Sequence, residues 1–217
     1  VVMAKTDPAA GARGVTTFLV EKGAEGMTFG RAEEKLGQHA AITTGISFEG
    51  CELPDDALLG PENQGFILSM SSLDGGRLGI AAQSVGIARA AFEAALDYAS
   101  ERESFGEPIR EHQGVQFKLA DMATRIEAAR LLTYKAAWLR DRGYRVTREA
   151  SMAKLFASET ATFVTDAAVQ IFGGYGYSRD YPVERYFRDA RVTTIYEGTS
   201  EIQRMVIGRQ LYRERER

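Results

Sequence analysis

The spacing of apolar and polar residues changes near residue 60. Before that point, short apolar runs bounded by Gly, Pro and Asp are typical of β-strands, and they fall at residues 1–6, 14–22, 26–31 and 43–53. From Gly65 onward the apolar spacing becomes helical. We therefore expect a β-rich piece over residues 1–60, followed by an α-helical bundle domain over residues 61–217.

Three long helices and one shorter helix are expected in the second part. The first covers residues 66–102, which contain no proline, and the second and third cover residues 115–143 and 147–172. Short loops between helices of this length favour an antiparallel four-helix bundle. In the second helix one stripe of the surface is apolar, formed by Val115, Leu119, Met122, Ile126 and Ala129.

The end of the third helix and the start of the last helix are marked by residues typical of helix caps. Gly173 directly follows the third helix and suits a left-handed C-terminal cap. Ser200 and Gln203 have the spacing of a capping box, so the last helix is expected to begin at Ser200.

Composition and charge exclude several classes of protein. The 217 residues are 44% hydrophobic and 26% charged, which is ordinary for a globular protein with its own core. A net charge of −3 argues against a general nucleic-acid binder. No apolar run approaches the length of a membrane span, and no signal peptide is visible. The chain opens on an apolar run rather than on Met, which suggests a piece of a longer chain or a processed product.

The few cysteine and histidine residues predict neither a disulfide nor a metal site. Cys51 is the single cysteine, and no His or cationic motif flanks it, so a small strand residue is expected rather than a catalytic thiol. His39 and His112 are too far apart in sequence to form a local metal-binding motif.

Glu197 is a lone carboxylate in an unusual setting. It follows Ile195 and Tyr196, precedes Gly198, and stands just before the last helix. Apolar neighbours disfavour the ionised carboxylate, whereas a nearby helix N-terminus favours it. Opposed influences of this kind suit a carboxylate to acid–base chemistry. The alternative is a solvated acid in a loop.

A glycine cluster interrupts the first long helix. Gly75, Gly76 and Gly79 each cost about 1 kcal/mol relative to Ala in a helix interior. Close approach by a neighbouring helix or by a ligand would explain them. Asp74 and Arg77 lie three residues apart on one face, and they either contact the same ligand or form an ordinary ion pair.

Two further segments are candidate ligand contacts. Gly174 and Gly176 exceed what a helix cap at Gly173 needs, and bare backbone there would admit a flat or phosphorylated ligand. The segment follows a helix and lacks the dinucleotide-binding glycine fingerprint, so a Rossmann fold is not indicated. Arg102 stands near the start of the second long helix and suits an anion, with a solvated loop as the alternative.

Taken together, these segments resemble the acyl-CoA dehydrogenase family, in particular its short-chain and short-branched-chain members. The resemblance is collinear, covers essentially the whole chain, and corresponds to the later part of the family's sequence. It is carried by "AKTDPAAGARGVTTFLVEKGAEG", "KLGQHA", "FEGCELPDDALLG", "LDGGRLGIAAQSVGIARAAFEAALDYASERESFGEPI", "HQGVQFKLADMA", "VQIFGGYGYSRDYPVERYFRDAR" and "IYEGTSEIQR".

The resemblance implies a fold and a reaction. The fold would be mainly α, with part of a β-barrel-like middle domain before the antiparallel four-helix bundle. The reaction would be FAD-dependent oxidation of an acyl-CoA thioester to a trans-2-enoyl-CoA, as in fatty-acid β-oxidation. Glu197 matches the family's catalytic base, which removes the Cα proton while the Cβ hydride passes to FAD. Some members carry the base at the position of Gly76, which cannot act as one.

The resemblance also assigns binding roles residue by residue. The acyl-CoA contacts would be Asp74, Gly75, Gly76, Arg77 and Gly198. The FAD contacts, many of them reaching a cofactor held by a neighbouring subunit, would be Arg102, Ser104, His112, Gln113, Gln170, Ile171, Phe172, Gly173, Gly174, Thr199, Ser200 and Glu201.

Partners and alternatives follow from the same resemblance. It implies an electron-transferring flavoprotein as electron acceptor, a homo-oligomer arranged as a dimer of dimers, and a bacterial cytoplasm or, in a eukaryote, the mitochondrial matrix. An acyl-CoA oxidase would use the same residues and pass electrons to oxygen. A non-catalytic CoA-binding or helical assembly module is the alternative from a different class.

Overall fold

The computed structural model describes residues 1–215, and it divides into two compact units. The first unit comprises Val1–Lys35 and His39–Leu73. The second comprises Leu36–Gln38 and the chain from Asp74 onward.

The first unit contains two small antiparallel sheets. β1 (Val2–Lys5) pairs with β2 (Val15–Phe18), and β3 (Met27–Ala32) pairs with β4 (Thr44–Phe48). β1, β2 and β4 fall within the segments that the apolar runs predicted, and β3 extends one residue beyond its segment, to Ala32. The strand expected over residues 43–53 is too long, because Gly50 adopts a φ of +60° and turns the chain after β4. Cys51 therefore lies beyond the strand, half-buried, and its prediction as a strand residue is wrong.

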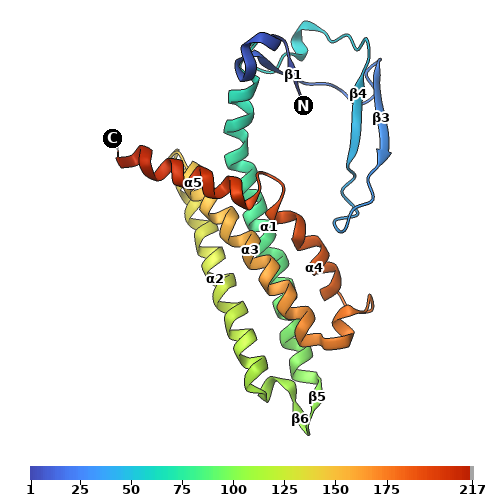
Figure 1. The fold of residues 1–217 in the computed structure, drawn as a ribbon, viewed down its shortest axis with the longest axis vertical. Helices are drawn as coiled ribbons and strands as arrows, with labels where there is room; N and C mark the ends of the chain where they lie inside the picture. The colour runs from blue at the N-terminus through green and yellow to red at the C-terminus, as the bar shows by residue number, and fades with distance from the viewer. Residues whose placement is uncertain (216–217) are drawn as a thin grey trace. The chain divides into compact units, whose positions relative to one another are not determined.

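The second unit is a bundle of helices. Its elements are α1 (Gly65–Glu101), β5 (Glu103–Ser104), β6 (Glu107–Pro108), α2 (Gln113–Asp141), α3 (Thr147–Phe172), α4 (Val183–Arg191) and α5 (Ser200–Arg215). α1 belongs to this unit from Asp74 on, and α1, α2 and α3 run beside one another (Figure 1). The short hairpin of β5 and β6 lies at the end of the bundle opposite α5 (Figure 1).

Small side chains let the three long helices approach closely. α1 contributes a row of fully buried alanines, and the apolar stripe predicted for α2 faces the same core, with Met122 and Ile126 buried and Val115 and Leu119 packed against it. The row on α1 is formed by Ala81, Ala88, Ala91, Ala95 and Ala99. The predicted stripe of α2 is confirmed.

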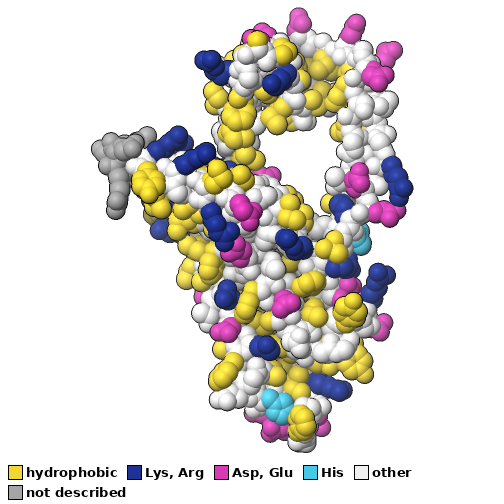
Figure 2. Space-filling model, in the orientation of Figure 1, with side chains coloured by type: hydrophobic (Ala, Val, Ile, Leu, Met, Phe, Trp, Pro, Cys, Tyr) yellow, Lys and Arg dark blue, Asp and Glu magenta, His cyan; other side chains and the backbone are white. Residues whose placement is uncertain are grey.

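α2 also carries apolar side chains on its opposite side. Phe117, Leu131, Tyr134 and Trp138 are all more than half exposed. Hydrophobic side chains lie among charged ones over the visible face of the helical unit (Figure 2). In the described part of the chain this stripe of α2 stays more than half exposed, and its one cation contact is the Arg142 guanidinium, 3.7 Å from the ring centre of Trp138.

The last helix begins at the expected residue but is capped differently. Thr199 is the N-cap, and its Oγ1 accepts a hydrogen bond from the N–H of Ile202 at 3.4 Å. The side-chain amide of Gln203 donates instead to the carbonyls of Glu197 and Gly198, at 3.0 Å each. The capping box predicted for Ser200 and Gln203 is therefore wrong, because the turn before the helix offers Gln203 two carbonyl oxygens.

None of the described helices combines the length and the apolar character that a membrane span requires.

Candidate active site

The loop between α4 and α5 presents Glu197 in a strained conformation. Glu197 has a φ of +53° and Gly198 a φ of +87°, so two successive residues are left-handed. A positive φ is uncommon for a residue with a side chain and is found where surrounding contacts fix it. One such contact comes from α1, where Oε1 of Gln83 accepts a hydrogen bond from the Tyr196 hydroxyl at 2.6 Å.

The Glu197 carboxylate lies against bare backbone of α1. A Cβ added to Gly76 would lie 2.6 Å from Cδ of Glu197 and closer still to its Oε2. Oε2 is buried and has no hydrogen-bond partner among the described residues. A buried carboxylate oxygen without a partner is costly, so this one calls for an explanation beyond the contacts of the described residues.

The three glycines of α1 are explained by different surroundings. Gly76 makes room for Glu197, and a Cβ on Gly75 would meet the Arg140 guanidinium at 2.6 Å. A Cβ on Gly79 would meet nothing within 4 Å. Close approach of side chains therefore accounts for Gly75 and Gly76, and packing against the described residues does not account for Gly79.

Two side-chain donors bind the backbone carbonyls of this loop. Nζ of Lys154 on α3 donates to the carbonyl of Gly198 at 2.7 Å, next to the Gln203 amide. The side chain of Lys154 has no exposed surface. The pKa of Lys154 is lowered from 10.5 to about 8, first by burial and then by the charge of Arg77, while Glu197 acts in the opposite direction.

The buried lysine makes a testable contribution to stability. Its pKa is about 8 in the folded chain and 10.5 ordinarily, so the unfolded chain binds more protons between these pH values. The cost of burying the charge is present in full below pH 8 and is gone above pH 10.5. At 1.36 kcal/mol per pKa unit, it is roughly 3 kcal/mol. We expect the free energy of unfolding of the wild type to rise by about that amount over this range, relative to Lys154→Met, in urea unfolding. Parallel pH dependences in the two proteins would contradict it.

Asp74 and Arg77 form the ion pair that the sequence left as an alternative. Nη1 of Arg77 lies 2.9 Å from Oδ1 of Asp74, and Oγ1 of Thr147 donates to Oδ2 of Asp74 at 2.7 Å. Arg77 is buried, and its Nε has no partner among the described residues. The pair ties α1 to the start of α3 beside the Glu197 loop.

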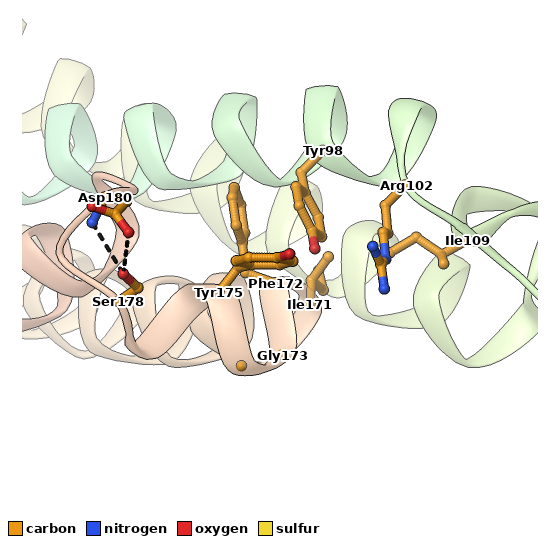
Figure 3. Close-up of a pocket in the computed structure, with 10 residues that line it drawn as sticks. Tyr98, Arg102, Ile109, Ile171, Phe172, Gly173, Tyr175, Ser178 and Asp180 are labelled. Carbon is orange, nitrogen blue, oxygen red and sulfur yellow. Dashed lines mark hydrogen bonds between the residues drawn. The ribbon is translucent and has the colours of Figure 1, made fainter.

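A second group of predicted residues surrounds a cavity of about 560 Å³ near the C-terminal end of α1. The Arg102 guanidinium lies 5.8 Å from the ring centre of Tyr175, and the rings of Tyr98 and Phe172 stack at 4.1 Å (Figure 3). Gly173, with a φ of +58°, leaves backbone bare at the rim. The cavity combines a cation, aromatic faces and open backbone.

The remaining residues predicted near Arg102 differ in their surroundings. Nε2 of His112 lies 2.9 Å from Oγ of Ser104, and its Nδ1 lies 3.3 Å from a carboxylate oxygen of Glu107. Gln113 and Gln170 are exposed. Ile171 and Gly174 line the cavity with Arg102.

A third group lies at the start of α5. Thr199, Ser200 and Glu201 line a cavity of about 340 Å³ together with Arg191. Oγ of Ser200 is buried and has no partner among the described residues. Hydrogen bonds from backbone N–H and then from the Thr199 hydroxyl lower the pKa of the Glu201 carboxyl.

The predicted cofactor residues do not form one site on this chain. Gly76, beside Glu197, lies on α1, and Arg102 directly follows the last residue of that helix. Their separation of 26 residues corresponds to about 39 Å at 1.5 Å per residue. That length exceeds the reach of one dinucleotide. The structure brings together Glu197, Gly198, Gly76 and the Asp74–Arg77 pair, and it places the Arg102 group at the other end of the bundle.

Lys154 and Gln203 were missed as site residues by sequence reasoning. A signal for Lys154 was present, because it lies on the same helical face as Ala150, Ala157 and Ala161, all fully buried. A charged residue within such a stripe needs a buried partner. Its partner is 44 residues away, in the Glu197 loop.

Comparison with known proteins decides the family. The model of the acyl-CoA dehydrogenase C-terminal domain matches residues 63–212. The chain belongs to the acyl-CoA dehydrogenase family. It is 54% identical to an acyl-CoA dehydrogenase of Bacillus subtilis over 211 residues, which are 97% of this chain and 56% of the relative. The resemblance found in the motifs is confirmed.

Solved structures of the family agree with this fold. Butyryl-CoA dehydrogenase from Megasphaera elsdenii matches with a TM-score of 0.96 at 49% identity, over 97% of this chain and 55% of that one. A chain in a structure described as the electron transferring flavoprotein of Acidaminococcus fermentans matches with a TM-score of 0.96 at 53% identity, over 97% and 56%. The chain therefore spans about half the length of the relatives it matches.

Proposed function

We propose that this chain carries the base of an FAD-dependent acyl-CoA dehydrogenase, and that Glu197 removes the Cα proton of a short acyl-CoA thioester. One observation carries the proposal: the buried, unpaired Oε2 of Glu197 lies over the bare backbone of Gly76. A structural carboxylate at this depth would be expected to have a donor, as Asp74 does. A carboxylate that accepts a proton from the substrate has no protein donor on the oxygen that takes the proton.

The chemistry explains why the carboxylate needs this setting. The α-proton of a thioester is too weakly acidic for a free carboxylate, and it becomes removable when the carbonyl is polarised in a site that excludes water. By family resemblance, the backbone N–H of Glu197 is one such polarising donor. Gly198 leaves space beside the base for the thioester. FAD, when bound, takes the hydride that leaves Cβ.

Two separate places on this chain suit different parts of an FAD molecule. The N-terminus of α5 offers backbone N–H groups beside the unpaired Ser200 hydroxyl, which suits a polar or phosphate-bearing part of the cofactor. The Arg102 cavity offers a guanidinium and open glycine backbone for pyrophosphate. The loop that leads into α5 lies on Gly76, which is about 39 Å from Arg102 along the axis of α1, so each place would serve a different FAD, shared with a neighbouring subunit.

The exposed apolar stripe of α2 supports assembly into a homo-oligomer. Leu131, Tyr134 and Trp138 present aromatic and aliphatic surface that a second subunit would cover. A dimer of dimers with cofactors at the interfaces is the arrangement that family resemblance suggests.

The substrate class and the electron acceptor rest on the relatives. The similarity to butyryl-CoA dehydrogenase favours a short acyl chain. The similarity to a chain in the Acidaminococcus flavoprotein structure favours an electron-transferring flavoprotein as acceptor.

The reaction is tested in a protein that carries this chain at the full length of its relatives. We expect the purified protein to be yellow, and anaerobic butyryl-CoA to bleach its flavin absorbance. Slow reoxidation by oxygen and fast reoxidation by electron-transferring flavoprotein would identify a dehydrogenase, and the reverse would identify an oxidase. A colourless protein that neither takes up FAD nor reacts would favour a non-catalytic module.

Arg102 is expected to control FAD retention. In the same full-length protein, Arg102→Ala removes the guanidinium from the glycine-lined cavity and should lower the FAD retained after dialysis at least tenfold, because charge-assisted contacts to phosphate are strong. Arg110→Ala is the matched control, since that exposed arginine pairs with its neighbour Glu111. Equal FAD content in the two variants, measured by absorbance, would remove Arg102 from the cofactor site.

A further inference from the structure

Lys154 is a buried cation for which the proposed reaction has so far given no role. It is the largest side chain without exposed surface in the described part of the chain. A buried lysine is retained at a cost unless its charge is used. Its ammonium reaches the carbonyl of Gly198 at 2.7 Å, one residue after the proposed base.

Gln203 is the second fully buried polar group at this point. Its amide nitrogen donates to the carbonyls of both Glu197 and Gly198. Two consecutive carbonyls are thus held by donors from two different helices, α3 and α5. The carbonyl of Gly198 receives both donors, so removal of one leaves it paired.

Lys154 and Gln203 form a clamp on the strained part of the loop. Glu197 and Gly198 are both left-handed, and such a conformation persists when surrounding contacts determine it. With the two carbonyls directed toward Lys154 and Gln203, the Glu197 side chain extends to Gly76 on α1. The backbone contacts and the side-chain contact therefore come from three different helices.

Four charged groups act on Lys154. They are Arg77 on α1, Glu159 on α3, Glu201 on α5 and Glu197 itself. Three carboxylates favour the ammonium against one guanidinium, and the pKa of about 8 leaves the lysine protonated at pH 7. Lys154 therefore acts on the loop as a charged donor under ordinary conditions.

We propose that Lys154 and Gln203 are positioning residues of the proposed dehydrogenation, because together they clamp the carbonyls of Glu197 and Gly198 and so hold the base over Gly76. The inference rests on the proposed function. It predicts that loss of either donor slows proton removal while FAD and acyl-CoA still bind.

The experiment uses the full-length, FAD-loaded protein. Lys154→Met keeps the length of the side chain and removes the charge and the donor, and Lys118→Met is the matched control on an exposed lysine of α2. We expect Lys154→Met to lower the rate of flavin reduction by butyryl-CoA roughly 10- to 100-fold, as displacement of a base by about 1 Å does. FAD content and binding of crotonyl-CoA, the product of butyryl-CoA oxidation, should match the Lys118→Met control.

A double variant separates positioning from general damage. In the Glu197→Gln background, Lys154→Met should leave the residual rate unchanged within twofold, because a residue that acts through the base has nothing left to position. Gln203→Met is an independent test that leaves the lysine bond in place, and it should slow reduction about tenfold.

The outcomes are distinct. If Lys154→Met and Gln203→Met reduce flavin at the control rate while Glu197→Gln does not, the positioning role is wrong and the proposed base stands. If Glu197→Gln itself reduces flavin at the wild-type rate, the proposed function fails first. If both variants lose FAD binding or crotonyl-CoA binding by the same factor as they lose flavin-reduction rate, the two residues are structural and the inference is overturned.

Discussion

Glu197→Gln is expected to remove nearly all flavin reduction by butyryl-CoA while FAD and acyl-CoA still bind. Gln keeps the shape of the side chain and its reach toward Gly76, but it has no basic oxygen to accept the Cα proton. A general base contributes about 10²–10⁴-fold, and a site with a single base should show the upper end of that range. Stopped-flow loss of oxidised-flavin absorbance under anaerobic conditions measures the effect.

Two further variants test the position of the carboxylate and serve as a control. Glu197→Asp withdraws the carboxylate by one methylene group, and a misplacement of about 1 Å can cost 10²-fold, so its rate should fall between wild type and Gln. Glu93→Gln alters an exposed carboxylate of α1 paired with Arg89 and should reduce flavin normally. If Glu197 were only a solvated loop acid, Gln, Asp and wild type would all react alike, and the base would have to lie elsewhere.

Much of the helical unit could be predicted from local patterns. α3 begins at Thr147 and ends at Phe172 as expected, because helical apolar spacing continues on both sides of Lys154 and Gly173 supplies the residue of positive φ that ends it. α4 (Val183–Arg191) was not predicted as a helix. It is short and highly charged, and its buried side chains, Val183 and Ala190, are seven residues apart, too few to set a period.

Only part of the candidate site could be predicted from the sequence. Glu197 could be found because its apolar neighbours, its glycine and the helix start are all local. Its packing on Gly76 joins residues 121 positions apart, and the contact of Lys154 with the next residue, Gly198, joins α3 to a loop 44 residues later. The capping prediction at Ser200 failed for the same reason: the spacing to Gln203 is correct, but the tertiary turn offers Gln203 a better pair of acceptors.

The contact between Glu197 and Gly76 is itself open to a direct test, with Gly76→Ala and Gly79→Ala as a matched pair on one helix. Each replaces a helical glycine by Ala, and each should gain up to about 1 kcal/mol of intrinsic helix stability. A methyl group at residue 79 meets nothing within 4 Å, whereas one at residue 76 meets the end of the Glu197 side chain at 2.6 Å. The carboxylate can move aside without disturbing the backbone, so both variants should fold and retain FAD.

Only the rates should separate the two variants. We expect Gly79→Ala to reduce flavin at the wild-type rate and Gly76→Ala to react about 10²-fold more slowly, because its base is displaced by an ångström or more. Combining Gly76→Ala with Glu197→Asp tests the cause, since the shorter side chain leaves room for the methyl group. The double variant should therefore lose much less than the product of the two single effects. Equal rates for Gly76→Ala and Gly79→Ala would show that proton removal does not require the carboxylate to lie over Gly76. A fully multiplicative loss would show that the methyl group obstructs the substrate rather than the base.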